Sequence, residues 1–104
     1  MAAENRRLLI AIDAEIREIN HRTINPLFEE LRLSDLRPVI EMVAKARAEY
    51  LRALYDIAVK NSDGQPGKAD IERLSGLRQI YEELVKGTQA LETAIEREYL
   101  DVGK

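Results

Sequence analysis

Glu18 and His21 are the two residues whose types and spacing come nearest to a catalytic or metal-binding motif. A Glu-x-x-His pair places a carboxylate and an imidazole on one helical face, as in the di-iron helical bundles. The apolar residues of the same segment lie on the other side, so we expect both side chains to face solvent. A di-iron site also needs inward carboxylates from several helices. A solvated histidine is therefore the favoured interpretation, and a surface metal site at Glu18 and His21 is kept as an alternative.

Few other residues could carry chemistry. The 104 residues contain no Cys and a single His, which excludes thiolate nucleophiles, thiolate metal ligands and disulfides within the chain. The glycine-containing run 61–68 lacks the recurring acidic ligands of a calcium loop, and no phosphate-binding G-x-x-x-x-G-K-S/T sequence occurs. We therefore expect no cofactor.

Charge is spread evenly along the sequence. Sixteen Lys and Arg stand against nineteen Asp and Glu, and the two signs are interspersed. Duplex binding needs a concentrated basic surface, so we expect no nucleic-acid partner. No stretch approaches 18 uncharged apolar residues, so we expect neither a membrane span nor a signal peptide. The lack of Cys favours the cytoplasm.

A middle helix, predicted over 38–60, carries the most informative pattern. Its charged residues recur at steps of three and four and form one narrow stripe, namely Glu41, Lys45, Glu49, Arg52, Asp56 and Lys60. Apolar residues occupy the rest of the circumference, which is wider than one neighbouring helix can cover. We therefore predict that a second copy of the chain or a partner helix covers this surface, through Ile40, Met42, Val43, Tyr50, Leu51, Leu54 and Tyr55.

A first helix is predicted over about 4–22, where Leu9, Ile12, Ile16 and Ile19 form an apolar stripe. Pro26 lacks an amide hydrogen, so the helix either restarts as a short extension over 26–33, which we favour, or continues with a kink.

A third helix is predicted over 70–99, after the loop 61–68, with an apolar three-four rhythm that continues through Gly87. The short loop makes the last two helices antiparallel neighbours. The sequence thus predicts an all-α fold in a single domain, 1–104: an antiparallel three-helix bundle completed by dimerisation.

Arg47 is the one charge clearly off the solvent stripe of the middle helix. A charge directed toward the bundle needs a carboxylate, such as Glu82 or Glu83, or an anionic ligand held together with Arg22 or Arg32. Its aliphatic stem can also lie along the core while the guanidinium stays in water, which is the interpretation we favour.

Arg6, Arg22 and Arg32 lie in the first third of the sequence, and Thr88 and Glu92 share one face late in the last helix. With these residues, its length and its three-helix order, the chain resembles the AroQ-type chorismate mutases, a family of dimeric helical enzymes. There, scattered Arg and Lys hold the two substrate carboxylates, and a late Gln or Glu contacts the ether oxygen. The resemblance implies such roles for these five residues.

The sequence departs from that family pattern in two places. Ala44-Lys45 stands where the family carries an Arg-Glu pair, and Pro26 interrupts what should be one unbroken first helix. We therefore favour a non-enzymatic helical interaction module, meaning an adaptor, chaperone-like protein or regulatory subunit. A small dimeric enzyme or anionic-ligand-binding bundle is the alternative, with ligand-binding candidates Arg22, Arg32, Arg47, Thr88 and Glu92.

Overall fold

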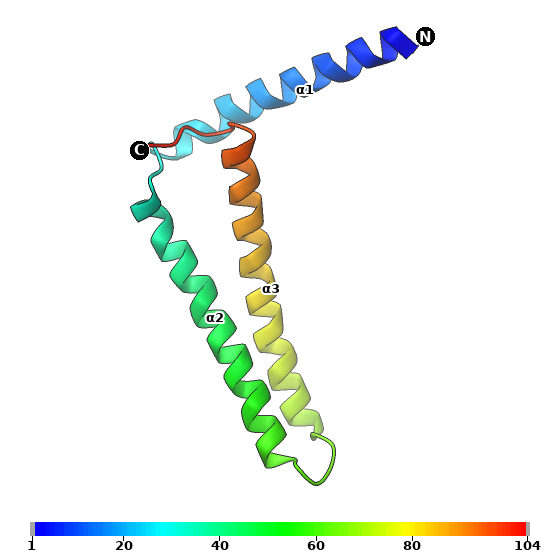
Figure 1. Ribbon diagram of the computed structural model, residues 1–104, viewed down its shortest axis with the longest axis vertical. Helices are drawn as coiled ribbons and strands as arrows, with labels where there is room; N and C mark the ends of the chain where they lie inside the picture. Colours follow the sequence, from blue (N-terminus) through cyan, green and yellow to red (C-terminus); the bar gives the residue numbers. More distant parts are fainter. Residues whose placement is uncertain (1, 104) are drawn as a thin grey trace. The chain divides into compact units, whose positions relative to one another are not determined.

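The computed structural model describes residues 2–103 and is all-helical (Figure 1). Within these residues, three helices, α1 (Ala2–Ile24), α2 (Leu33–Lys60) and α3 (Lys68–Glu96), are accompanied by a 3₁₀ turn, η1 (Asn25–Leu27). Extended pairing within 2–103 is limited to an isolated bridge between Leu31 and Val102. The predicted all-α class with three helices is therefore confirmed. No helix among the described residues is long and apolar enough to cross a membrane.

The chain divides into two compact units. One consists of the residues up to Asp35 together with those from Ala90 onward, and the other is Leu36–Gln89. That the chain behaves as one domain stays a prediction.

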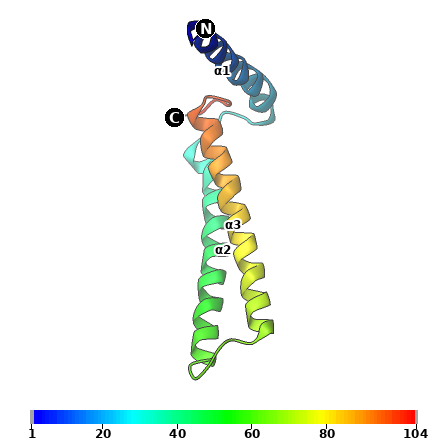
Figure 2. The same cartoon turned by 90° about the vertical axis from the view of Figure 1, so that its right-hand side faces the viewer.

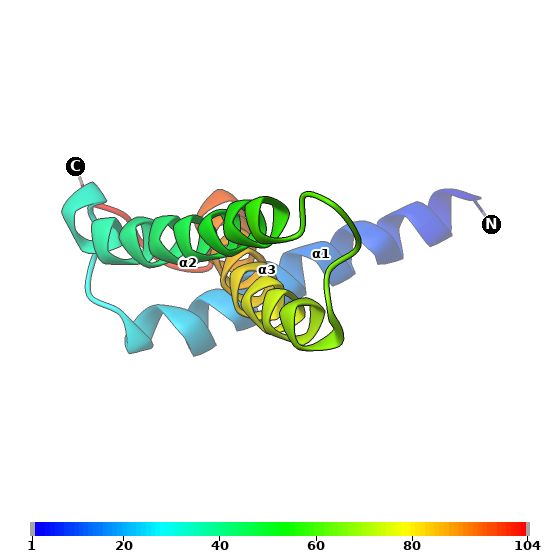
Figure 3. The same ribbon diagram turned by 90° about the horizontal axis from the view of Figure 1, so that it is seen from below.

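Leu36–Gln89 is an antiparallel hairpin of α2 and α3, which lie side by side in Figures 2 and 3. The residues of α2 that are buried recur at steps of three, seven and four, and two of the four are alanines. Small side chains let two helix backbones approach closely. The predicted hairpin is confirmed, and its core is thin because its buried residues are Val43, Ala46, Ala53 and Ile57.

The turn of the hairpin is held by polar contacts. Asn61 donates its side-chain amide to the carbonyl oxygen of Ile57 at 2.8 Å, which satisfies one of the last carbonyls of α2. The ammonium of Lys60 lies 3.4 Å from Asp70, which is in the first turn of α3. An acid in the first turn also suits the helix dipole.

The predicted helical extension over 26–33 is wrong. After α1 the chain makes only the turn η1, in which the amide of Phe28 donates to the carbonyl oxygen of Asn25, and Phe28 itself is extended. Pro26 cannot donate the hydrogen bond that would continue α1, so the α-helix ends at Ile24.

The second helix begins at Leu33, five residues before the predicted start at Pro38. Asp35 accepts a hydrogen bond of 2.9 Å from the amide of Arg32, as the third residue of a capping box does. Pro38 therefore lies inside α2, just after its first turn, rather than at its start.

The third helix ends at Glu96 rather than at Tyr99. The amide of Glu98 donates to Ile95 and that of Tyr99 donates to Ala94, which is the Schellman pattern of a helix C-terminus. Glu98 adopts the left-handed conformation that this pattern requires, with φ of 62°. Gly87 lies inside α3, so the prediction that the helix continues through it is confirmed.

Candidate functional site

One face of α2 remains apolar and open to solvent. Residues at steps of four and three follow this face, which we call the outer seam of α2: Ile40, Ala44, Arg47, Leu51, Leu54 and Ala58. Ile40, Leu51 and Leu54 are 54%, 53% and 45% exposed. A spacing of three and four is the one that lets a second helix pack by knobs into holes. The outer seam therefore has the geometry of a helix-binding surface.

Arg47 lies at the middle of the outer seam and is held there by α3. Its Nε donates to the hydroxyl of Tyr81 at 3.2 Å, and its guanidinium carbon lies 5.3 Å from the centre of the Tyr81 ring. That ring is stacked on Tyr50, with the two centroids 6.2 Å apart. Among residues 2–103 the structure shows no ion pair for Arg47. Its charge is thus positioned by Tyr81 and has no carboxylate partner among the described residues. The favoured interpretation, with the stem along the core and the guanidinium in water, stays a prediction.

The predicted contact residues of the middle helix divide into three groups. Val43 is buried in the hairpin, and Tyr50 is half-buried against Tyr81. Met42 is exposed, but it comes nine residues before Leu51. At about 100° per residue, the two side chains therefore point to opposite sides of α2, about half a turn apart around its axis. The outer seam and the position next to it hold the other four: Ile40, Leu51, Leu54 and Tyr55.

A hollow of about 250 Å³ lies on the hairpin between the two helices. Tyr50 of α2 forms one wall, and Ile71, Leu74 and Ser75 of α3 form the other with Arg78. The guanidinium of Arg78 is 3.9 Å from Glu82, its neighbour one helical turn away. The hollow is thus an apolar groove with a cation that its own helix partly neutralises.

The other unit contains a network that ties the end of α1 to the end of the chain, which we call the C-terminal network. The amide of Asp101 donates to the side-chain oxygen of Asn25 at 2.8 Å, and Nε2 of His21 donates to the Asp101 carboxylate at 3.1 Å. Leu31 donates its amide to Asp101 and accepts from Gly103, at 3.2 and 2.6 Å. Leu100, only 3% exposed, is the apolar anchor of this network.

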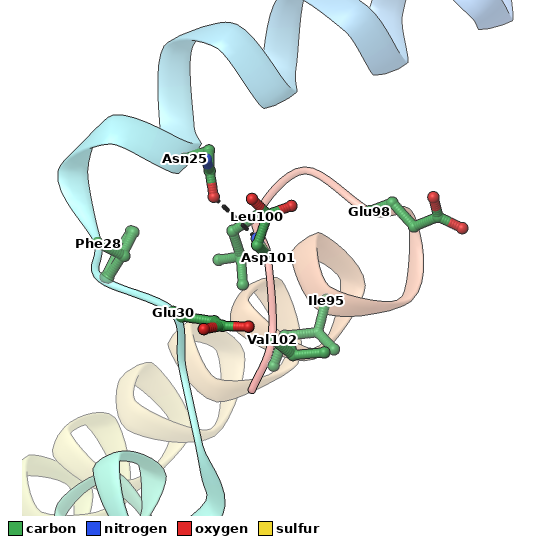
Figure 4. Close-up of a pocket in the computed structure, with 8 residues that line it drawn as sticks. All are labelled: Asn25, Phe28, Glu30, Ile95, Glu98, Leu100, Asp101 and Val102. Atoms are coloured by element: carbon green, nitrogen blue, oxygen red, sulfur yellow. Dashed lines mark hydrogen bonds between the residues drawn. The ribbon is translucent and has the colours of Figure 1, made fainter. Parts of the chain in front are cut away.

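A hollow of about 610 Å³ opens beside the C-terminal network (Figure 4). Its lining combines carboxylates with apolar side chains and comprises Asn25, Phe28, Glu30, Ile95, Glu98, Leu100, Asp101 and Val102. Asp101 is paired with His21, and for the other two acids the structure shows no ion pair among residues 2–103. The hollow is open and, among the described residues, no buried cation or donor converges on it.

Arg97 links the segment after α3 to α1 within this unit. Its guanidinium binds the carboxylate of Asp13, and its Nε donates to the hydroxyl of Tyr99 at 2.9 Å. The hydrogen bond to Asp13, followed by the one to Tyr99, raises the pKa of Arg97 above its ordinary value. Arg97 is therefore a structural cation.

The candidate metal pair is not joined by further ligands. His21 binds Asp101, and Glu18 is exposed. Within residues 2–103 no three His, Asp or Glu side chains lie together in a way that could hold a metal ion. The observed partner of His21 is thus a carboxylate 80 residues away rather than Glu18.

The candidate anion-binding residues have separate surroundings. Arg22 and Arg32 belong to the unit that contains α1, whereas Arg47 and Thr88 belong to the hairpin. The hydroxyl of Thr88 donates to the carbonyl oxygen of Leu84 at 2.8 Å, which occupies it within its own helix. Glu92, Arg22 and Arg6 are exposed. A shared ligand site for these residues stays a prediction.

The stem of Arg32 packs against Gly103. A Cβ atom added to Gly103 would lie 2.8 Å from Cγ of Arg32, which is closer than such atoms approach. The amide of Arg32 also caps α2 through Asp35. Arg32 therefore helps to position the end of the chain.

Sequence reasoning missed Tyr81 and Asp101 as partners of Arg47 and His21. Tyr81 falls on the apolar rhythm of α3, so its ring position could be predicted, whereas its hydroxyl partner could not. Asp101 carries no local signal, because its partners Asn25 and His21 are 76 and 80 residues away.

No protein-family model, curated protein sequence or solved structure matches this chain. The resemblance to chorismate mutases thus stays an expectation from sequence.

Proposed function

We propose that this protein is a small helical interaction module that forms a homodimer through the outer seam of α2. The observation that carries the proposal is the exposed three-four row on α2, which stays open to solvent beside the face that α3 covers. Exposed apolar area of this regularity stabilises association when a second helix covers it. A cytoplasmic location suits a chain without cysteine.

Leu51→Gln tests the proposal. Leu51 is 53% exposed, and covering the rest of a leucine contributes about 1 kcal/mol, which a symmetric dimer counts twice. About 2 kcal/mol corresponds to a rise of about 30-fold in the dissociation constant, and an unsatisfied amide in the interface would add to it. The dimer–monomer equilibrium is measured by analytical ultracentrifugation over a concentration series.

Met42→Gln is the matched control. Met42 is also on α2 and is 45% exposed, but it lies about half a turn from Leu51 and outside the outer seam. We expect its dissociation constant to stay within about threefold of the wild-type value, because the same polar change then falls outside the interface. Equal effects of the two substitutions, or a monomeric wild-type protein, would refute the proposal.

A further inference from the structure

We infer that the helix covering the outer seam of α2 is α1 of a second copy, with Glu15 of one chain facing Arg47 of the other. This inference rests on the proposed function, since it names the surface that the outer seam binds. It states which segment provides the second half of the interface.

The first observation is that α1 has an apolar stripe and no buried residue. Ile12, Ile16 and Ile19 are 43 to 44% exposed, and Leu9 is 66% exposed. These residues follow one another at three, four and three positions, the same rhythm as the outer seam of α2. Two stripes with a common rhythm can interlock along their length.

The second observation is charge complementarity. The outer seam has one cation at its middle, Arg47, which Tyr81 holds in place without neutralising it. The stripe of α1 is flanked at its middle by Asp13 on one side and Glu15 on the other. Asp13 is already bound by Arg97 and Arg17. Glu15 is exposed, and among residues 2–103 no ion pair is recorded for it, so it is the carboxylate available to Arg47.

The same charge disfavours pairing of α2 with α2 of the second copy. Two α2 helices from different copies could pack antiparallel with large residues facing small ones. In that register Ile40 faces Ala58 of the second copy, and Ala44 faces Leu54. The two Arg47 side chains then lie four residues apart along the axis, about 6 Å at 1.5 Å per residue. Like charges this close, with no carboxylate between them, oppose association. A partner helix with a central acid, such as α1, removes this repulsion.

The inference is tested by reversing each charge in a separate protein. In the Glu15→Arg homodimer two cations meet at each contact, and in the Arg47→Glu homodimer two carboxylates meet. We expect each variant alone to have a dissociation constant at least tenfold above wild type. When the two differently tagged variants are mixed, one contact of the heterodimer pairs the two substituted positions with their charges exchanged. The other contact keeps the native Glu15 and Arg47 pair, so we expect a heterodimer within about threefold of wild-type affinity.

Matched controls carry the same charge changes on outward faces. Glu18 lies on the far side of α1 from the apolar stripe, and Lys45 lies on the charged stripe of α2. We expect Glu18→Arg and Lys45→Glu to leave the dissociation constant within about threefold of wild type, and their mixture to form no preferred heterodimer. Far-UV circular dichroism of each variant verifies that helix content is retained.

Four results would overturn the inference. If mixing the two charge-reversed variants restores nothing, the contact is not between α1 and α2 of different copies. If each variant alone is as tight a dimer as wild type, Glu15 and Arg47 do not meet. If a single chain carrying both reversals shows the native monomer fold and the separate variants only lose stability, α1 packs on α2 within one chain. Loss of the dimer by Leu51→Gln with no effect of the charge reversals would refute this inference and leave the proposed function intact.

Discussion

Ala53→Leu should separate the two helices of the hairpin. Ala53 is 1% exposed and lies with Ala46 where α2 faces α3, so three added carbons have no solvent side to occupy. Overfilling a packed position of this kind costs about 1–3 kcal/mol of unfolding free energy. The hairpin has few other buried groups to offset the loss, since its remaining buried residues are Val43 and Ile57.

The effect is measurable by thermal and urea unfolding followed by far-UV circular dichroism. For a chain of about this size each kcal/mol lowers the melting temperature by about 4–8 °C. Protein concentration must be the same for all variants, because dimerisation also raises the apparent stability. The urea midpoint should fall with little change in slope, as expected for a change in stability alone.

Ala48→Leu is the matched control, because it is the same substitution on the same helix at an exposed position. We expect it to change the unfolding free energy by less than about 0.5 kcal/mol. If Ala53→Leu were as stable as Ala48→Leu, the close approach of α2 and α3 at Ala53 would be wrong.

Three further substitutions test local contacts. Tyr81→Phe removes the hydroxyl that accepts a hydrogen bond from Arg47 but keeps the stacked ring, so we expect the unfolding free energy to fall by about 0.5–1.5 kcal/mol. An unchanged midpoint of urea unfolding would contradict that hydrogen bond. Leu100→Ala removes the apolar anchor of the C-terminal network and should lower the unfolding free energy by about 2–5 kcal/mol. We expect faster amide exchange over 99–103, and exchange at the wild-type rate would show that Leu100 does not anchor this segment. Glu98→Gly relieves the left-handed backbone after α3 and should raise the unfolding free energy by up to about 1 kcal/mol, whereas a decrease would argue against the observed helix end.

The hairpin could be predicted because its signals are local. The charged stripe of α2 and the three-four rhythm of α3 each lie within one helix, and the loop between them contains glycines and a proline. Such patterns specify which side of a helix is apolar. They also placed Arg47 off the solvent stripe, where the structure finds it held by Tyr81.

The chain between α1 and α2 could not be predicted in the same way. Residues after Pro26 resemble a helix in composition, but Leu31 makes its backbone hydrogen bonds with Asp101 and Gly103 near the other end of the sequence. Contacts this distant outweigh local helix propensity and leave no periodic trace. The end of α3 was missed for a related reason, because the left-handed position is occupied by Glu98 where a glycine would have been the expected signal.

The candidate site was predicted in part. A wide apolar surface on the middle helix was recognised, but the sequence could not tell which flank α3 would cover. The structure assigns Val43 and Tyr50 to the hairpin and leaves Ile40, Leu51 and Leu54 in the outer seam. Periodicity gives the width of an apolar face, and only tertiary packing decides how it is shared between neighbours.

The sedimentation behaviour of the wild-type chain and the Leu51→Gln variant, over the same concentration series, tests the central claim most directly. We predict a wild-type dimer at tens of micromolar chain and dissociation of Leu51→Gln to monomer in that range. A wild-type protein that sediments as a monomer throughout, or a variant that sediments as wild type does, would contradict the claim that the outer seam of α2 is an interface.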